Sequence, residues 1–258
     1  MEKLIAIVLA AGAGKRMNSK VAKQYIELNG KPVLWYALQA FSQSELVSHI
    51  VLVVGHGEED YVKEEIVDRY GFEKVALICE GGAERYLSVW NGLQAISAKG
   101  LLEDAVQERK EDASGGRDVK DHTYIAIHDG ARPFVTQQII EDTLCAAKEY
   151  GACVAGMPVK DTIKISDENG FAASTPKRDL VWAVQTPQVF DGQLIYSAYE
   201  KLLRNLEELI AKGIAITDDA MVVEHMTGEK VKLVKASYEN IKITTPEDLI
   251  LAQGILDR

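Results

Sequence analysis

Residues 10–17 of the chain, Ala-Ala-Gly-Ala-Gly-Lys-Arg-Met, combine residue types that suit the binding of a phosphate chain. Gly12 and Gly14 have no side chain, so backbone N–H groups in this segment can approach phosphate oxygens closely. Lys15 and Arg16 place two cations directly after the glycines. The pattern predicts a phosphate-binding loop, and the residues expected to form its nucleotide contacts are Ala10, Ala11, Gly12, Gly14 and Lys15.

Two familiar glycine loops do not fit this segment. A dinucleotide-binding fingerprint needs a third glycine, where the chain has Met17, and an acid after the second strand, where it has Gly55 and His56. A Walker A loop needs Ser or Thr after Gly-Lys, but here Arg16 follows Lys15. The remaining functional interpretation is a triphosphate site, and the alternative is a tight turn with a solvated basic face.

The distribution of charge favours a small polyanionic ligand. The chain has 258 residues and a formal net charge of -10, yet residues 1–31 hold six Lys and Arg against two Glu. An acidic protein is poorly suited to broad binding of nucleic acid or an anionic membrane, because counterion release needs a basic surface. No apolar run reaches the ~18 to 20 residues of a membrane span, and no signal peptide is evident, so we expect a cytoplasmic protein.

The hydrophobic pattern predicts a scaffold that can position this loop. Strands are expected over residues 4–10, 50–54, 75–79, 124–128, 152–159 and 231–235, and helices over residues 32–41, 58–70, 84–96, 136–150, 193–211 and 218–226, with a last helix opening at residue 245. This alternation is typical of a parallel sheet covered by helices on both faces. The sequence therefore predicts an α/β fold with a doubly wound, mostly parallel Rossmann-like sheet in one domain, residues 1–258. The glycine loop would lie at the carboxyl edge of the sheet, where such folds bind ligands.

Two segments depart from the alternation. Asn169 and Gly170 separate two short extended runs, and Asn-Gly favours a type I′ turn. Residues from about 160 to 187 are therefore expected to contain a projecting β-hairpin arm. Residues 97–122 carry twelve charged residues and break the pattern, which indicates a charged insertion made of a helix and a loop.

Structural roles are expected for the remaining Cys, His and Asp residues. The cysteines form no C-x-x-C pair, which argues against a disulfide framework or a thiolate zinc site and predicts buried, reduced thiols at Cys79, Cys145 and Cys153. No histidine pair has the spacing of a transition-metal site, and His128, at a strand end, is expected to position its neighbours by hydrogen bonds. Asp218 and Asp219 precede a helical pattern, so capping is their expected role.

Six blocks of residues extend the glycine loop into a longer pattern. The first joins Gly12-x-Gly14-x-Arg16-Met17 to Lys23-Gln24-Tyr25 and Gly30-Lys31-Pro32, and the others lie at residues 81–89, 128–133, 158–164, 185–190 and 240–249. With these blocks in this order, the chain resembles the 2-C-methyl-D-erythritol 4-phosphate cytidylyltransferases, sugar nucleotidyltransferases of the non-mevalonate isoprenoid pathway. It departs from that family at Ala22, where proline is usual, and in residues 97–122, which are longer than the usual link.

The resemblance implies that the chain transfers CMP from CTP to 2-C-methyl-D-erythritol 4-phosphate, giving 4-diphosphocytidyl-2-C-methyl-D-erythritol and pyrophosphate. It implies Mg²⁺ as cofactor, bound mainly through the CTP phosphates, with no firmly assigned protein ligand and Asp129 as a candidate. A ribitol or ribulose 5-phosphate cytidylyltransferase is the alternative, although residues 240–249 resemble the methylerythritol enzymes more. A nicotinamide-dependent oxidoreductase is disfavoured by the missing ribose acid, and an inactive nucleotide-binding scaffold by the presence of the expected cations.

The resemblance also implies roles on the nucleotide side of the site. Arg16 and Lys23 match the cations that contact the α-phosphate and stabilise its pentavalent transition state. Small residues would let backbone groups read the cytosine edge, and those that match the family pattern are Gly81, Gly82 and Ser88.

On the acceptor side, the residues implied are Asp129, Arg132, Thr162, Arg178, Thr186 and Lys242. Lys242 and Arg178 would hold the 4-phosphate of the acceptor, and Asp129 would lie near the ribose and acceptor hydroxyls. Arg178 and Thr186 would come from the partner subunit of a homodimer, because the hairpin arm embraces the neighbour in this family. Arg132 could reach an acceptor phosphate or hold its own loop in place, and both interpretations stay open.

Overall fold

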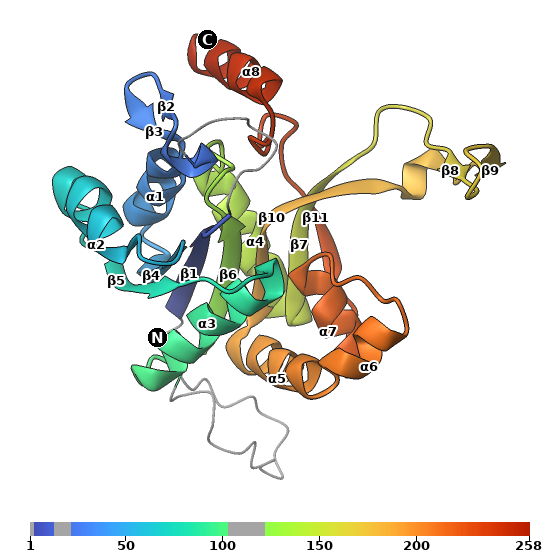
Figure 1. Ribbon diagram of the computed structural model, residues 1–258, viewed down its shortest axis with the longest axis horizontal. Helices are drawn as coiled ribbons and strands as arrows, with labels where there is room; N and C mark the ends of the chain where they lie inside the picture. The colour runs from blue at the N-terminus through green and yellow to red at the C-terminus, as the bar shows by residue number, and fades with distance from the viewer. Residues whose placement is uncertain (1–2, 13–21, 103–121) are drawn as a thin grey trace.

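The computed structural model describes residues 3–12, 22–102 and 122–258, and its centre is a seven-stranded sheet (Figure 1). The strands are β1 (Lys3–Ala10), β4 (Val47–Val54), β5 (Val75–Glu80), β6 (Thr123–Asp129), β7 (Ala152–Pro158), β10 (Trp182–Asp191) and β11 (Lys232–Lys235). Their order is β11-β7-β10-β6-β1-β4-β5. β10 is antiparallel to both of its neighbours, and the other adjacent strands are parallel. The predicted doubly wound, mostly parallel sheet is therefore confirmed.

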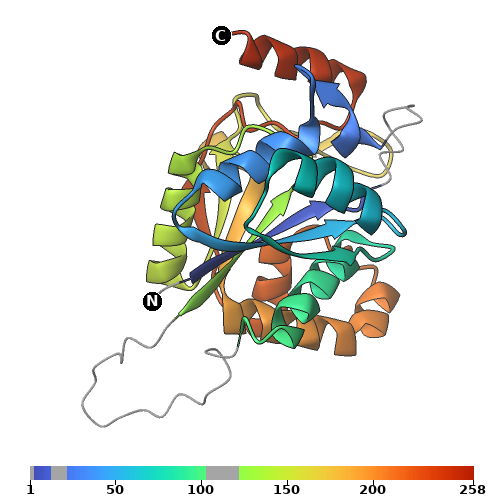
Figure 2. The ribbon, with the colours of Figure 1, turned by 90° about the vertical axis from the view of Figure 1, so that its left-hand side faces the viewer.

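Helices cover both faces of the sheet (Figure 2). They are α1 (Val33–Gln43), α2 (Glu59–Val62) with its π-helical continuation η3 (Lys63–Asp68), α3 (Arg85–Ala98), α4 (Gln137–Tyr150), α5 (Gly192–Arg204), α6 (Leu206–Ala211), α7 (Asp219–Thr227) and α8 (Pro246–Leu256). Side chains of β1 alternate between the faces, because successive residues of a strand point in opposite directions. Leu4, Ala6 and Val8 pack with α1, α2 and α4, whereas Ile5 and Ile7 pack with α3, α5 and α7.

The C-terminal helix packs on a small hairpin formed by β2 (Glu27–Leu28) and β3 (Lys31–Pro32). Leu28, Ile243 and Ala252 belong to one buried cluster between these elements. Thr245 and Asp248 form a capping box at the start of α8, where the sequence predicts that a helix opens. This packing fixes the chain just before α8 against the body of the protein.

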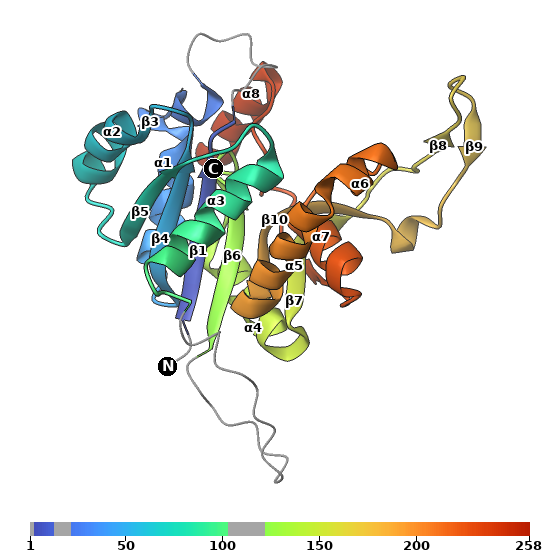
Figure 3. The ribbon, with the colours of Figure 1, turned by 60° about the horizontal axis from the view of Figure 1, so that its bottom comes forward.

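A short hairpin projects from the sheet between β7 and β10 (Figure 3). It consists of the antiparallel strands β8 (Ile165–Ser166) and β9 (Ala172–Ser174), which are exposed along their whole length. The expected two-residue type I′ turn is wrong. The Asp167 N–H donates to the Phe171 carbonyl at 2.8 Å, so three residues form the loop, and only Gly170 has a positive φ, of 83°. Asp167 also accepts the N–H groups of Asn169 and Phe171, and this carboxylate stabilises the longer loop.

The segment 97–122, the cysteines and the helix lengths were also the subject of sequence predictions. Helix α3 continues to Ala98 and Leu102 is buried, so the first residues of the segment 97–122 belong to the body of the protein. The rest of the predicted insertion, residues 103–121, lies outside the described residues. All three cysteines are free thiols, but only Cys153 is buried, and Cys145 is exposed on α4. No helix in the described ranges is long and apolar enough to cross a membrane.

Candidate active site

The glycine segments that follow β1 and β5 lie side by side at the carboxyl edge of the sheet. The Gly81 N–H donates to the carbonyl of Val54 at 2.7 Å, and a Cβ placed on Gly81 would lie only 2.3 Å from Cβ of Ala11. The absence of a side chain at Gly81 is therefore what lets the two segments touch. The Gly82 N–H donates to the hydroxyl of the buried Ser88 at 3.0 Å, which closes the second segment onto α3.

Lys23 lies over the first of these segments. It begins a short turn of 3-10 helix, η2 (Lys23–Tyr25), and a Cβ placed on Gly12 would lie 4.0 Å from Cε of Lys23. The structure thus brings Ala10, Ala11, Gly12, Lys23 and Gly81 together, as the sequence predicts. The expected nucleotide contacts of Gly14, Lys15 and Arg16 lie outside the described residues.

A cationic centre, formed by Arg85, Asp129, Arg132 and Lys242, lies at the end of β6. Lys242 Nζ is 2.8 Å from Asp129 Oδ2, Arg132 Nε is 3.7 Å from the same oxygen, and Arg85 Nε is 3.5 Å from Oδ1. Burial alone would raise the pKa of Asp129, but Arg85, Lys242 and Arg132 together hold that pKa well below its usual range. Asp129 is therefore ionised, and its carboxylate holds three cations close to one another.

Arg85 is fixed by a second carboxylate, which lies in the interior. Its Nη1 and Nη2 donate to Oδ1 and Oδ2 of Asp219 at 2.8 and 2.7 Å, and the hydroxyl of Tyr199 donates to Asp219 Oδ1 at 2.6 Å. Asp219 is fully buried, and its N–H donates to the side-chain oxygen of Gln188 at 3.0 Å. Three cations and two carboxylates leave the surroundings of the centre with one positive charge in excess, which suits an anionic ligand.

Sequence reasoning gave Arg85 no role and assigned Asp219 the wrong one. Capping is confirmed for Asp218, which accepts the N–H of Met221 at 3.1 Å, whereas Asp219 pairs with Arg85. One sequence signal could have revealed the role of Asp219: it directly follows Asp218, which alone is enough to cap the helix. A second signal was the position of Arg85, three residues after the glycine pair that follows a strand.

Thr186 and His128 hold the backbone of Asp129. The Asp129 N–H donates to Thr186 Oγ1 at 3.0 Å, the same oxygen is 3.0 Å from His128 Nδ1, and His128 Nε2 is 3.1 Å from the Arg132 carbonyl. These contacts are satisfied together when the Thr186 hydroxyl donates to Nδ1 and Nε2–H donates to the carbonyl. Burial lowers the pKa of His128 to about 4, so its ring is neutral. The positioning role predicted for His128 is confirmed.

The position of Thr186 corrects one expectation. Its side chain was expected to serve the site of a partner subunit, but it is buried within its own chain, where its hydroxyl holds Asp129 and His128. The reason is the course of β10, which returns from the arm and pairs with β6 from Gln188 onward. Thr186 therefore precedes this pairing and lies beside the end of β6.

Arg132 and Asn240 tie the loop after β6 to the segment that carries Lys242. Arg132 Nη1 donates to the Asn240 carbonyl at 2.8 Å, Asn240 Nδ2 donates to the Thr186 carbonyl at 2.9 Å, and the Ile243 N–H donates to the Ala131 carbonyl at 2.9 Å. Because Arg132 Nη1 is engaged by the Asn240 carbonyl, this side chain holds its own loop in place. Lys242, whose side chain is 34% exposed, can reach a ligand.

Two predicted acceptor residues lie apart from this centre. Thr162 and Arg178 are exposed residues of the arm, and Arg178 Nη1 is 3.5 Å from the carbonyl of Lys160. Within a single chain the structure does not join them to the residues around Asp129.

The donor set around Asp129 bears on the metal. In the part of the chain that the structure describes, no three His, Cys, Asp or Glu side chains are grouped as a metal site. Asp129 is a single carboxylate whose oxygens both face cations. The centre therefore does not fit an all-protein metal cage, and an Mg²⁺ ion there would need phosphate oxygens and water as its main ligands.

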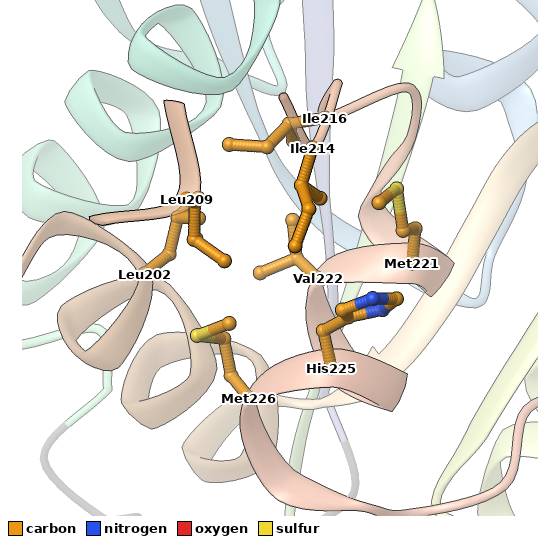
Figure 4. Close-up of a pocket in the computed structure, with 8 residues that line it drawn as sticks. All are labelled: Leu202, Leu209, Ile214, Ile216, Met221, Val222, His225 and Met226. Atoms are coloured by element: carbon orange, nitrogen blue, oxygen red, sulfur yellow. The ribbon is translucent and has the colours of Figure 1, made fainter. Parts of the chain in front are cut away.

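An apolar pocket lies on another part of the protein, between α5, α6 and α7 (Figure 4). Leu202, Leu209, Val222 and Met226 line it, and the ring of His225 stands at its side. No Lys or Arg lines this pocket, so it does not suit a triphosphate. The cationic centre is the candidate site.

Comparison with known proteins points to one family. The family model described as 2-C-methyl-D-erythritol 4-phosphate cytidylyltransferase matches residues 4–111 and 105–258. A protein of that name from Lachnoclostridium phytofermentans is 47% identical over 256 residues, covering 99% of this chain and 97% of its own length. One from Alkaliphilus oremlandii is 45% identical over 256 residues, covering 99% of this chain and 96% of its own.

Solved structures agree with this result. The crystal structure of 4-diphosphocytidyl-2C-methyl-D-erythritol synthase from Anaerococcus prevotii is similar with a TM-score of 0.75 at 33% identity, covering 100% of this chain and 97% of its own. The structure of 2-C-methyl-D-erythritol 4-phosphate cytidylyltransferase from Francisella tularensis gives a TM-score of 0.71 at 29% identity, covering 98% and 99%.

Proposed function

The chain belongs to the 2-C-methyl-D-erythritol 4-phosphate cytidylyltransferase family, and we propose that its cationic centre is where CMP passes from CTP to 2-C-methyl-D-erythritol 4-phosphate. The products are 4-diphosphocytidyl-2-C-methyl-D-erythritol and pyrophosphate, on the way to isoprenoid precursors. The observation that carries the proposal is the buried Asp129 with Arg85, Arg132 and Lys242 around it, beside the paired glycine segments. The family assignment does not favour the ribitol or ribulose 5-phosphate alternative.

The reaction needs charge neutralisation more than it needs a base. A phosphate oxygen of the acceptor attacks the α-phosphorus of CTP, a new P–O bond forms, and the bond to the pyrophosphate oxygen breaks. Both reactants are anions, so cations that bring them together and stabilise the extra charge of the transition state supply most of the catalysis. No covalent enzyme intermediate is required.

Each side of the reaction has a group in place. Backbone N–H groups near Gly12 and the ammonium of Lys23 would bind the phosphates of CTP, together with Arg16 as a proposal from the family pattern. Lys242 would bind the phosphate of the acceptor, because its ammonium is partly exposed and held at Asp129. Asp129 would accept hydrogen bonds from sugar hydroxyls, since its pKa keeps it ionised.

Mg²⁺ belongs to the same proposal. When bound, it would neutralise charge on the triphosphate, and phosphate oxygens and water would be its main ligands. Asp129 is the carboxylate of the cationic centre that could contribute an oxygen to it.

A homodimer would complete the acceptor site. The arm exposes Phe171 and Leu180, at 73% and 74%, and it carries Thr162 and Arg178 away from their own centre. An exposed arm that bears both apolar and polar side chains suits the site of a second subunit. Lys23→Ala and Arg178→Ala subunits should each be nearly inactive alone but regain activity when mixed. If Arg178 acted within its own chain, the mixed dimers would gain nothing.

A pyrophosphate-release assay tests the reaction. With CTP and Mg²⁺ we expect turnover with 2-C-methyl-D-erythritol 4-phosphate, little with ribitol or ribulose 5-phosphate, and none without an acceptor. Lys242→Ala should lower kcat/KM for the acceptor by about 100-fold, whereas Lys235→Ala, a change at an exposed lysine of β11, serves as the control. Turnover with ribitol 5-phosphate alone would overturn the assignment. The net charge of -10 supports the absence of a nucleic-acid or anionic-membrane partner. A cytoplasmic location is part of the same proposal, and cell fractionation tests it.

A further inference from the structure

The turn that carries Lys23 is anchored at two points. The side-chain amide of Gln24 donates to the carbonyl of Ala10 at 2.6 Å, in the interior. The hydroxyl of Tyr25 donates to Glu58 Oε2 at 2.7 Å. The first anchor joins the turn to the end of β1, and the second joins it to the connection between β4 and α2, 33 residues further along the chain.

Glu58 is itself held in place. The Gly55 N–H donates to Glu58 Oε2 at 3.0 Å, and the Glu58 N–H donates back to the Gly55 carbonyl at 3.1 Å. A Cβ placed on Gly55 would lie 2.6 Å from Oε2, so a glycine is needed for this close approach. The ring of Tyr61 packs edge-on against that of Tyr25, with the centroids 5.5 Å apart. The carboxylate that accepts from Tyr25 is therefore held in place by its own backbone contacts at Gly55.

The backbone before Lys23 explains why such an anchor matters. Ala22 has φ -60° and ψ 139°; the ring of a proline would impose this φ and is compatible with this ψ. Alanine leaves this conformation to be selected from others, at a cost in conformational entropy that proline would have avoided. Side-chain contacts must then supply the restraint on Lys23 that the backbone does not.

We propose that Glu58 is a positioning residue for Lys23, acting through the hydroxyl of Tyr25 and replacing the restraint of a proline at position 22. The inference rests on the proposed function, in which Lys23 contacts the α-phosphate of CTP. Gln24 fixes the near end of the turn and the Tyr25–Glu58 bond fixes its far end, so loss of the bond lets the turn tilt over Gly12. Displacement of a catalytic cation by about 1 Å can cost about 100-fold in rate.

Two variants remove the anchor without touching Lys23. Tyr25→Phe and Glu58→Ala should each lower kcat by about 10- to 100-fold, with little change in KM for the acceptor. Tyr36→Phe is the matched control, because it also removes a tyrosine hydroxyl that donates to an oxygen at 2.6 Å, the Leu28 carbonyl, and should keep kcat within about twofold. Melting curves identify any variant that fails to fold. If Glu58→Ala does not fold, Glu58→Gln replaces it; because glutamine retains an oxygen acceptor, the loss of kcat should be smaller.

A double-mutant cycle and a rescue separate positioning from general stability. In a Lys23→Ala background, measured by single turnover, Tyr25→Phe should cost nothing further, because the group being positioned is gone. Ala22→Pro should restore most of the kcat lost in Tyr25→Phe. Equal losses of kcat from Tyr25→Phe in both backgrounds, or no rescue by Ala22→Pro, would overturn the inference. If the wild-type enzyme is active in the same assays, the proposed function is unaffected by that result. Absence of pyrophosphate release by the wild type would instead count against the proposed function.

Discussion

Arg85 donates two hydrogen bonds to the fully buried carboxylate of Asp219, at 2.8 and 2.7 Å, although the two residues are 134 positions apart in the chain. The same guanidinium turns its Nε toward Asp129 at 3.5 Å. This pairing links the start of α3 to the start of α7, and both helix starts to the end of β6. The orientation of Arg85 in the cationic centre thus depends on a residue that lies outside it.

Removal of Arg85 should destabilise the protein severely. Arg85→Met leaves the carboxylate of Asp219 buried without a cation, and breaking a buried ion pair in this way costs about 3 to 5 kcal/mol. The free energy of unfolding from urea titration measures the loss. Arg69→Met is the control, because Arg69 pairs with Glu65 at the surface and should change stability little. Similar losses of unfolding free energy in both variants would show that the buried Arg85–Asp219 pair stabilises the fold no more than a surface pair does.

Gly81→Ala should weaken CTP binding without unfolding the protein. The added Cβ would meet Cβ of Ala11 at 2.3 Å, so the segment after β1 must move away. We expect KM for CTP to rise about tenfold or more, because a small displacement of phosphate contacts is costly. Gly254→Ala in α8 is the control, since no atom lies within 4 Å of the added Cβ. An unchanged KM for CTP in Gly81→Ala would place the nucleotide elsewhere.

Acidification should destabilise the fold well before Asp129 is protonated. Burial lowers the pKa of His128 to about 4, against about 6.5 in an unfolded chain. Between these values the unfolded chain binds more protons than the folded one, so stability falls as the pH drops from about 6.5 to 4, by up to roughly 3 kcal/mol. Because the pKa of Asp129 is lowered, its own contribution is lost only below about pH 4.

Urea titrations at several pH values check this dependence. The decline between pH 6.5 and 4 should be shallower in His128→Asn. It should be steeper in His56→Asn, because Glu80 raises the pKa of His56 and gives that residue the opposite sign. A decline that is the same in wild type and His128→Asn would mean that other groups cause it.

Only one thiol should react quickly in the native protein. Cys145 is exposed, whereas burial raises the pKa of Cys79 to about 11 and that of Cys153 to about 12, which keeps both as unreactive thiols. An aromatic disulfide reagent should therefore label one thiol in a fast phase, and all three in urea. Cys145→Ser should abolish the fast phase, and its persistence would show that a buried thiol becomes accessible.

The parts of the fold that could be predicted from the sequence are those with a local cause. The strand patterns, the cap at Asp218 and the start of the last helix at residue 245 follow from residues close together in the chain, and the structure confirms them. The prediction of a two-residue hairpin loop was wrong, and the reason is also local. The carboxylate of Asp167 accepts two backbone N–H groups and favours a longer loop than Asn169-Gly170 alone would form.

The candidate site was only partly predictable, because its cations are arranged by distant contacts. Asp129 and Lys242 could be named from family-like blocks, but the choice of Asp219 as partner of Arg85 depends on how α7 packs beside α3. Likewise, the expectation that Thr186 reaches a neighbouring subunit was wrong, because the pairing of β10 with β6 places Thr186 beside Asp129. No pattern within a few residues carries that information.

Gly192, at the start of α5, shows how the chain accommodates the segment that differs most from the family pattern. A Cβ placed there would lie 2.8 Å from the Thr123 carbonyl and 3.1 Å from Cδ2 of Leu102, so the chain on either side of residues 103–121 meets at one point. That point is the amino end of β6, and Asp129 is at the other end of the same strand. A tag or a second domain grafted between Leu102 and Thr123 would therefore leave and re-enter the fold at the end of β6 that is opposite Asp129.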